Sequence, residues 1–528
     1  MIILSLYCGH NAAACILKNG KVLINWELER FSRIKHDYGY NQEFINKTLE
    51  LCDLTIQDVD ILSINFRDYG RKIPFHVPNT CNVTHIEFQG IVNGKTLRSI
   101  ACNHHLSHAA SAYYTSPFLS STVLSLDGGG CCENKGTSIF EGNKLIEFKP
   151  GSAINIAGIW SGITMNNYRM PRLHAWDPGS GSGKIMALAA YAPPNEQIEQ
   201  QLIRDMKKGG QPHYTDVHGP AFNNNEDLTD THSLRSQTVA SSIQSLTEKF
   251  VHSHFEQAYK TFPNDNICYA GGIALNCVAN TRILKQSNFK NLHVPPFPND
   301  TGLAIGMALY VWHHILNNPK STNFFSPYNG PEYNENDSLM ALKAHKDLSY
   351  KKLNMNELAE LISNENIVCV FKGKSESGPR ALGHRSIIAL PTIENLQDYL
   401  NSKTKLREWY RPYAPIVLEN YADEVLENYI PHSPYMTTSA TIKKEWRDRL
   451  LGVCHIDKTT RPQIVTKDHC GFVYKLLKKV YSLTNIPVLL NTSFNRKEPI
   501  VETPKEALET FKKLPIKYLV LDNFLVSK

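Results

Sequence analysis

A histidine-rich segment is the first place in this sequence where residue types and spacing could support chemistry. Residues 103–112 read Asn-His-His-Leu-Ser-His-Ala-Ala-Ser-Ala. If the segment is helical, His104 and His108 lie one turn apart on the same face, where two imidazoles can bind one metal ion, while His105 points elsewhere. The alternative is that these histidines are hydrogen-bonded core or surface residues.

Two acids are candidates for the remaining ligands of such a metal site. Asp127 and Asp300 each occupy a turn after an apolar strand. A pair of histidines needs two more oxygen ligands, and these two carboxylates are the candidates for them.

Glycines at three strand ends predict a nucleotide site. Glycines after a buried strand let backbone N–H groups approach a phosphate closely, although tight turns use the same residues. Runs of this kind occupy 124–130, 268–276 and 297–306. The residues expected to contact the nucleotide are Gly128, Gly129, Gly271, Gly272 and Asn276.

Cations in the last third of the chain predict a second anion site. They are interleaved with Gly, Pro and small apolar residues, a composition that does not suit the alternative, a solvated basic face. Arginine binds phosphate in bidentate fashion and lysine binds it as a point charge. The candidates are Arg380, Lys405, Arg411, Arg461, Ser493 and Asn495.

The elements that must position these side chains indicate a duplicated α/β domain. Residues 2–27 predict three strands, with the turn Gly9-His10-Asn11 after the first and Asn19-Gly20 as a hairpin turn. Residues 122–148 repeat that layout, with Asp127 in the corresponding turn. Helices are expected at 109–114, 183–192 and 233–260.

A polar stretch at 317–338, rich in Asn and Pro, is the expected linker between two domains, 1–330 and 331–528. The boundary is fixed by the sequence only to within 317–350.

Composition narrows the class of protein. The chain has 528 residues, 42% hydrophobic and 20% charged, which is typical of a globular protein with a large core. A formal charge of +6 is too small to indicate nucleic-acid binding. The 12 scattered cysteines, without a C-x-x-C pair, and the lack of a signal-like start or long apolar run predict a reduced, cytoplasmic, membrane-free protein.

Taken in order, the motifs resemble the O-carbamoyltransferases, a family that includes the nodulation-protein U group and enzymes that decorate tobramycin, cephem and ansamycin antibiotics. The resemblance covers nearly the whole chain. The motifs are GHNAAA (9–14), ELERFSRIKH (27–36), NHHLSHAASA (103–112), SLDGGG (125–130), GSGKIMALAAYA (181–192), YAGGIALNCVANTRI (269–283), SGPRALGHRSI (377–387), RPYAPIV (411–417) and LLNTSFN (489–495).

The resemblance implies a duplicated actin-like or sugar-kinase-type (ribonuclease H-like) domain followed by an α+β YrdC-like domain. The second domain would make carbamoyl-adenylate from Mg-ATP and carbamoyl phosphate. The first would pass the carbamoyl group to a small-molecule hydroxyl, as in antibiotic biosynthesis and other secondary metabolism, with no nucleic-acid partner and as a possible homodimer.

The resemblance also implies roles for individual residues. His10 would be the base near the acceptor hydroxyl. The metal, Fe²⁺ or another divalent ion, would be held by His104, His108, Asp127 and Asp300. The residues that would bind carbamoyl phosphate or the ATP phosphates are Arg380, Lys405, Arg411 and Ser493, with Arg461 as a further candidate.

The sequence departs from the family pattern in two ways. Many relatives have a longer C-terminal region and an arginine in place of Lys374, a difference that leaves the transfer cycle intact. The opening GHN replaces the usual HDSAA or HDASA and, together with the short length, suggests a divergent acceptor pocket. Two other functions remain open: carbamoyl transfer of the tRNA threonylcarbamoyladenosine type, and a nucleotide-binding scaffold without transfer activity.

Overall fold

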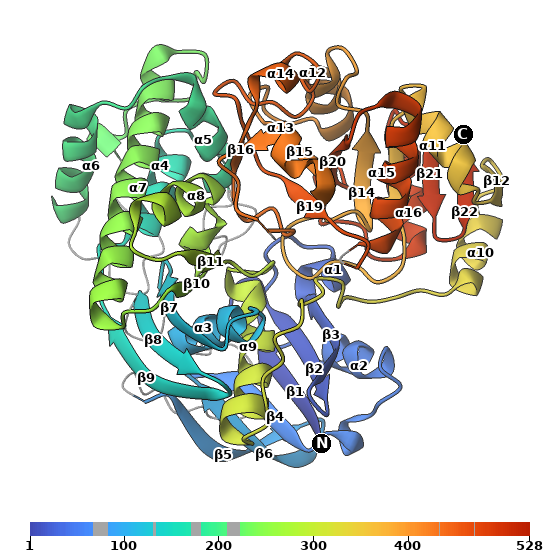
Figure 1. The fold of residues 1–528 in the computed structure, drawn as a ribbon. Coiled ribbons are helices and arrows are strands. Elements are labelled where there is room, and N and C mark those ends of the chain that lie inside the picture. The colour runs from blue at the N-terminus through green and yellow to red at the C-terminus, as the bar shows by residue number, and fades with distance from the viewer. Residues whose placement is uncertain (67–82, 130–133, 171–180, 209–221, 432, 469) are drawn as a thin grey trace. The chain divides into compact units, whose positions relative to one another are not determined.

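The computed structural model describes residues 1–66, 83–129, 134–170, 181–208, 222–431, 433–468 and 470–528 (Figure 1). These residues divide into two compact units, Met1–Phe325 and Ser326–Lys528. The division falls five residues before the expected boundary at 330/331. Gly130 and the Cys131-Cys132 pair lie outside the described residues.

The first unit contains two mixed sheets. The six-stranded sheet has the order β3-β2-β1-β4-β6-β5 and the five-stranded sheet the order β11-β10-β7-β8-β9. The strands of the first sheet are β1 Ile2–Tyr7, β2 Ala13–Lys18, β3 Lys21–Glu27, β4 Ile61–Asn65, β5 His85–Val92 and β6 Lys95–Cys102. Those of the second are β7 Ser120–Leu126, β8 Lys135–Glu141, β9 Lys144–Gly151, β10 Asn266–Ala270 and β11 Asn291–His293.

Strand pairing shows the duplication that the sequence predicts. β1 pairs antiparallel with β2 and parallel with β4, and β2 pairs antiparallel with β3. β7 pairs in the same way with β8 and β10, and β8 with β9. These pairings and the interleaved helices confirm the α/β class of this unit.

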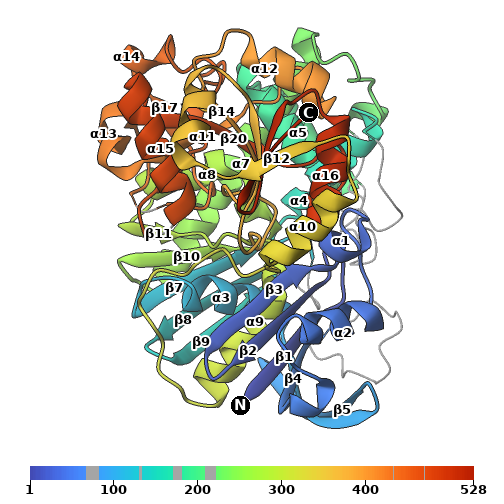
Figure 2. The same cartoon turned by 90° about the vertical axis from the view of Figure 1, so that its right-hand side faces the viewer.

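Two helices lie between the sheets, α3 (His104–Tyr114) and α9 (Leu303–Tyr310) (Figure 1, Figure 2). Each follows the last strand of its repeat, β6 or β11. A Cβ atom on Gly306 would lie 2.1 Å from the carbonyl oxygen of Ser107, so glycine is required where the two helices touch. The other α-helices of this unit are α1 Leu28–Ser32, α2 Gln42–Glu50, α4 Ile156–Asn166, α5 Ser182–Leu188, α6 Glu196–Lys208, α7 Leu234–Thr261 and α8 Cys277–Gln286.

The second unit is built on one eight-stranded mixed sheet, with the order β12-β22-β21-β13-β14-β20-β15-β19. Its strands are β12 Ser349–Lys352, β13 Val368–Phe371, β14 Arg385–Ala389, β15 Ala414–Leu418, β19 Gln463–Val465, β20 Val488–Ser493, β21 Tyr518–Leu521 and β22 Phe524–Ser527. A small three-stranded sheet consists of β16 Leu426–Glu427, β17 Ala440–Ile442 and β18 Thr459–Thr460.

Helices cover both faces of the large sheet. Along β13, Val368 and Val370 pack in a core with α11 (Met355–Ser363) and α15 (Gly471–Thr484), as successive side chains of a strand point to opposite faces. Cys369 and Phe371 pack in another core with α10 (Glu335–Lys343) and α16 (Pro504–Lys513). The short helices are α12 Leu396–Tyr399, α13 Ala422–Val425 and α14 Lys444–Arg447.

Two sequence expectations need correction or extension. The helix expected at 109–114 begins at His104, because Asn103 caps it by accepting a hydrogen bond from the Leu106 N–H. α10 begins at Glu335, inside the stretch expected to be a linker. Of the described helices, none combines the length and the hydropathy needed to cross a bilayer.

Candidate functional site

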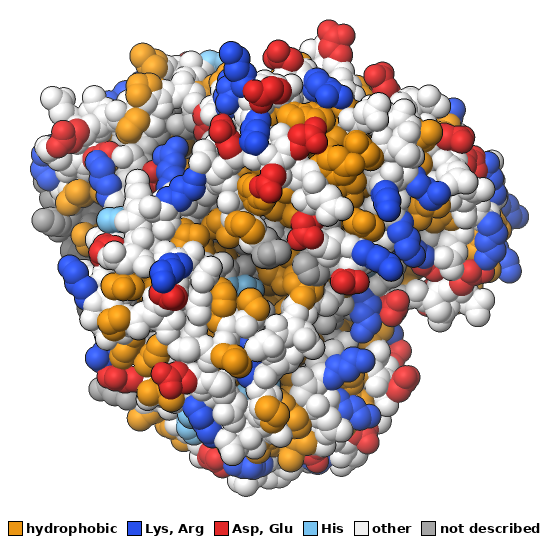
Figure 3. Space-filling model, viewed as in Figure 1, with side chains coloured by type: hydrophobic (Ala, Val, Ile, Leu, Met, Phe, Trp, Pro, Cys, Tyr) orange, Lys and Arg blue, Asp and Glu red, His pale blue; other side chains and the backbone are white. Residues whose placement is uncertain are grey.

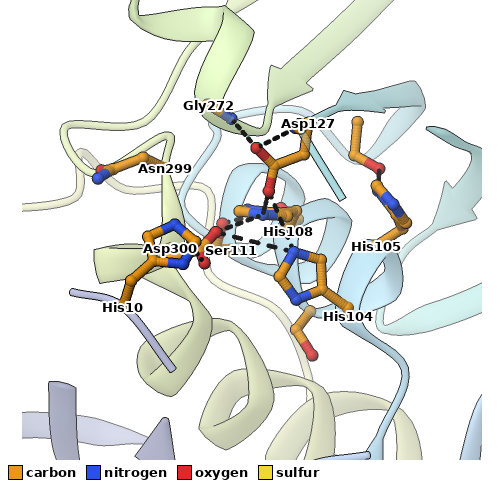
Figure 4. A network of polar contacts seen from close by, with 12 residues as sticks. His10, His104, His105, His108, Ser111, Asp127, Gly272, Asn299 and Asp300 are labelled. Atoms are coloured by element: carbon orange, nitrogen blue, oxygen red, sulfur yellow. Dashed lines mark hydrogen bonds and ion pairs between the residues drawn. The ribbon is translucent and has the colours of Figure 1, made fainter. Parts of the chain in front are cut away.

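Four side chains converge at the centre of the first unit: His104, His108, Asp127 and Asp300 (Figure 4). One ligand atom from each lies within 4.8 Å of all the others. The Asp127 Oδ2 atom is 3.1 Å from His104 Nε2 and 3.2 Å from His108 Nε2. The Asp300 Oδ1 atom is 3.2 Å from His108 Nε2 and 3.7 Å from His104 Nε2.

The duplicated architecture explains why these residues meet. His104 and His108 occupy the first turns of α3, one turn apart, and Asp127 directly follows β7. Asp300 starts the short helix Asp300–Gly302, which leads into α9. The N-terminal ends of α3 and α9 and the end of β7 thus place all four side chains at one point.

The spacing fits a shared metal ion. Ligands about 2.0–2.2 Å from one ion lie about 3.0–3.5 Å from each other in octahedral or tetrahedral geometry. Three of the four measured distances, 3.1, 3.2 and 3.2 Å, fall in that range, and the fourth is 3.7 Å. Two imidazoles and two carboxylates are a donor set suited to Fe²⁺, Zn²⁺ and similar divalent ions.

The electrostatics of this cluster favour a cation between the acids. Burial alone would lower the pKa of His108, but hydrogen bonds to Asp127 and Asp300 raise it to about 9. Burial would raise the pKa of Asp127, yet the two histidines hold it well below its usual range. The buried acids therefore require a positive partner, which a protonated histidine or a bound ion supplies.

Two backbone amides hold Asp127 in place. The N–H groups of Gly128 and Gly272 donate to Asp127 Oδ1 at 2.8 and 3.0 Å, which turns Oδ2 toward the histidines. The sequence predicted that these two residues contact a nucleotide, and that prediction stays untested. In this structure their N–H groups hold the carboxylate of a candidate metal ligand.

Gly129, Gly271 and Asn276, the other residues of the predicted nucleotide site, differ from Gly128 and Gly272 in what surrounds them. Gly271 has a φ of 97°, and a Cβ atom there would lie 2.0 Å from the Leu126 carbonyl oxygen. A Cβ atom on Gly129 would meet no atom of the described residues within 4 Å. Asn276 caps α8 and exchanges two hydrogen bonds with Gln244.

His10 lies beside the cluster. Its Nε2 is 3.2 Å from Asp300 Oδ2, and its side chain is 28% exposed, whereas that of Asp300 is 2% exposed. Figure 4 shows the His10 ring next to Asp300, and His105 turned away toward another partner. That partner is Ser125, whose Oγ is 2.9 Å from His105 Nδ1.

Sequence reasoning missed Tyr7, the last residue of β1. Its hydroxyl donates to Asp300 Oδ2 at 2.5 Å in the buried interior. A tyrosine ending an apolar strand looks like an ordinary core residue, and only the three-dimensional contact distinguishes it.

In the second unit, Lys405 is enclosed by acceptors. Its ammonium group donates to the carbonyl oxygens of Ser493 and Asn495, both at 2.8 Å, and to Asn495 Oδ1 at 2.6 Å. Lys405 is 4% exposed. These bonds hold the turn that carries Ser493, and the prediction that Lys405 binds phosphate stays a prediction.

The remaining predicted cations lie on loops of the same unit. Arg411 is partly exposed, and its Nη1 is 3.3 Å from Glu408 Oε2. Arg461 is half-buried between β18 and β19, and Arg380 is half-buried in the loop before β14.

A buried glutamate that the sequence did not single out anchors the loop of Arg380. Glu376 Oε1 accepts hydrogen bonds from the N–H groups of Leu382, His384 and Arg385 at 2.7, 2.8 and 3.1 Å. Glu376 is 1% exposed. Three bonds to one carboxylate oxygen fix the loop that presents Arg380.

The carbonyl groups of this loop are also bonded. The Leu382 carbonyl oxygen accepts from the Tyr328 hydroxyl at 2.9 Å and from the Gln463 amide at 2.7 Å. The Asn491 amide donates to the Ala381 carbonyl oxygen at 3.0 Å. Hydrogen bonds therefore hold this loop through its backbone N–H groups and through its backbone carbonyl groups.

Comparison with known sequences matches both parts of the chain to one family. Residues 79–309 match the family described as Carbamoyltransferase N-terminus, and residues 359–528 match Carbamoyltransferase C-terminus.

Similar proteins include nodulation protein U of Sinorhizobium fredii, 31% identical over 74% of this chain and 72% of that protein. Nodulation protein NolNO of the same species is 27% identical over 98% and 79%. A protein of Methanocaldococcus jannaschii of unstated function is 31% identical over the full length of both chains.

Solved structures show more distant similarity. Full-length HypF in its phosphate- and nucleotide-bound form has a TM-score of 0.33 at 11% identity, covering 61% of this chain and 56% of that one. The activator of the 2-hydroxyisocaproyl-CoA dehydratase from Clostridium difficile, with bound ADPNP, has a TM-score of 0.35 at 14% identity, covering 59% and 94%.

Proposed function

Because the chain belongs to the carbamoyltransferase family and is a carbamoyltransferase enzyme, we propose that it makes carbamoyl-adenylate from ATP and carbamoyl phosphate and carbamoylates a small-molecule hydroxyl. The observation that carries this proposal is the convergence of two histidines and two aspartates beside His10 in the unit matched to the N-terminal family. A natural product is the proposed class of acceptor.

The chemistry explains why two steps are needed. The nitrogen of a carbamoyl group donates electrons into its carbonyl, so an alcohol attacks it only when a good leaving group is attached. Water would first cleave carbamoyl phosphate to carbamate and inorganic phosphate. A carbamate oxygen would then attack the α-phosphate of ATP, which forms carbamoyl-adenylate and releases pyrophosphate. The acceptor hydroxyl would then attack the carbamoyl carbon and release AMP.

His10 is the proposed base for the second step. With Nε2 paired to Asp300, Nδ1 carries the lone pair that would take the proton of the acceptor hydroxyl. Asp300 would fix the ring orientation and stabilise the imidazolium that forms. A well-placed general base typically contributes a rate factor of about 10²–10⁴.

The four-residue cluster is the proposed metal site. Bound there, Fe²⁺ or another divalent ion would act as a Lewis acid and offset the negative charge that grows on the adenylate phosphate. Gly128 and Gly272 would keep Asp127 turned toward that site through their N–H groups.

The second unit is the proposed site of adenylate formation, in keeping with its YrdC-like resemblance. Arg380, Arg411 and Arg461 would bind the phosphates of ATP or carbamoyl phosphate, together with Ser493. Lys405 would act by fixing the turn of Ser493 and Asn495, because its donors already bond to that turn.

The face shown in Figure 3 gives no support to a tRNA substrate. On the face shown in Figure 3, Lys and Arg side chains are interspersed with Asp and Glu. Nucleic-acid binding usually needs a clustered basic surface.

The two half-reactions can be tested with one pair of variants. Purified enzyme is supplied with ATP, labelled carbamoyl phosphate and a panel of hydroxylated antibiotics and sugars, and pyrophosphate and labelled product are measured. We expect Arg411→Ala to abolish pyrophosphate release and His108→Ala to spare it while abolishing transfer. Pyrophosphate release by Arg411→Ala but not by His108→Ala would contradict this division between the units.

A further inference from the structure

We propose that Tyr7 is a positioning residue of the metal centre, which holds Asp300 so that only one carboxylate oxygen faces the ion. This inference rests on the proposed function, because it takes the cluster of His104, His108, Asp127 and Asp300 to be a metal site.

The contacts of Asp300 divide its two oxygens between two tasks. Oδ2 accepts the Tyr7 hydroxyl at 2.5 Å and lies 3.2 Å from His10 Nε2. Oδ1 faces His108 at 3.2 Å, on the side of the candidate ion. These two contacts on Oδ2 oppose a rotation of the carboxylate that would turn both oxygens toward one ion.

A glycine two residues later makes room for the Tyr7 hydroxyl. A Cβ atom on Gly9 would lie 2.2 Å from the Tyr7 hydroxyl oxygen and 2.5 Å from its Cζ. The φ of Gly9 lies outside the left-handed region, so the backbone conformation does not require glycine. The requirement is therefore space, and the occupant of that space is the phenol that reaches Asp300.

Tyr7 also touches a second member of the cluster and sits on a rigid element. Its ring packs edge-on against His104, with 6.3 Å between centroids. β1 is paired on both sides, with β2 and with β4, and Tyr7 is 1% exposed. A buried side chain at the end of a central strand can hold a ligand in one orientation.

Removing such a partner should weaken metal binding. Loss of the residue that orients a ligand typically lowers metal affinity by about 10–100-fold. Tyr7→Phe deletes only the hydroxyl, and Gly9→Ala keeps the hydroxyl but forces it away from Asp300. We expect both variants to show a loss of affinity in that range.

The experiment titrates metal-free, full-length protein with Co²⁺ and follows binding by calorimetry and by the visible absorption of the bound ion. The absorption reports coordination number, so release of Asp300 Oδ2 should change the spectrum of Tyr7→Phe as well as its affinity. Tyr113→Phe is the matched control. It removes another buried hydroxyl from the same unit, one that donates to the carbonyl oxygens of Leu119 and Gly142.

The outcomes are distinct. Weaker binding and an altered spectrum in Tyr7→Phe and Gly9→Ala, with Tyr113→Phe like wild type, support the proposal. An affinity of Tyr7→Phe within about threefold of wild type, an equal loss in Tyr113→Phe, or no Co²⁺ binding by wild type would overturn it. Because the titration requires no turnover, tight binding by an enzyme that transfers no carbamoyl group would refute the proposed function and leave the inference on Tyr7 standing.

Discussion

The carboxylate of Glu376 offers the sharpest test of how the second unit presents Arg380. In Glu376→Ala, the N–H groups of Leu382, His384 and Arg385 lose a shared acceptor in a site that is 1% exposed. The replacement should therefore destabilise the unit and loosen the loop.

The magnitude follows from the number of bonds. A buried donor left without a partner costs about 1–3 kcal/mol, so three cost about 3–9 kcal/mol. Domains are typically stable by about 5–15 kcal/mol, so Glu376→Ala should remove a large share of the unit's stability. Glu376→Gln keeps one acceptor oxygen but loses the charge, which roughly halves each bond, so its loss should be intermediate.

Thermal unfolding of the full chain, followed by calorimetry, measures the expected ranking in stability: wild type, then Glu376→Gln, then Glu376→Ala. For a unit of this size each kcal/mol corresponds to about 2–4 °C in Tm. Glu509→Gln is the matched control: it changes an exposed glutamate 4.0 Å from Lys505 and should alter stability by less than about 0.5 kcal/mol. The reasoning is refuted if Glu376→Ala unfolds within about 1 kcal/mol of wild type, or if Glu376→Gln is less stable than Glu376→Ala.

Two further outcomes are expected. His10→Ala should slow carbamoyl transfer by about 10²–10⁴-fold while pyrophosphate release continues, and an unchanged transfer rate would remove His10 from its proposed role. Burial raises the pKa of Asp457, but hydrogen bonds from His455 and Thr459 prevail and lower it to about 2, below its ordinary value of 3.8. The stabilising effect of the ionised carboxylate is therefore present above pH 4 and lost as the pH falls toward 2. Asp457→Asn should lower the free energy of unfolding by at most about 2.5 kcal/mol at pH 7, and thermal melts below pH 4 should show a progressively smaller loss.

Local spacing was the most informative part of the sequence. The interval between His104 and His108 is one helical turn, and the structure places both imidazoles on one face of α3. Asp127 was singled out because it ends an apolar strand, and such positions meet at the edge of a sheet. The sequence also predicted the duplication, because each repeat contains a hairpin turn that a short sequence motif identifies.

Contacts between distant segments left no such signature. The amides of Gly128 and Gly272 come together through Asp127, 145 residues from Gly272, so the sequence could not show that they were already bonded. Tyr7 and Asp300 are 293 residues apart and resemble a core residue and a turn residue when read singly. The acceptors of Lys405 lie almost ninety residues further along the chain, so the sequence did not show that its ammonium group bonds to them.

The two repeats of the first unit supply different donor atoms to the cluster. His104 and His108 follow β6 of the first repeat and provide only nitrogen, while Asp127 and Asp300 belong to the second and provide only oxygen. Neither repeat alone holds the mixed donor set, so the candidate metal site needs both repeats. An ion bound by these four residues would link one repeat to the other. A change in the tilt between the repeats would therefore change the distances between its ligands.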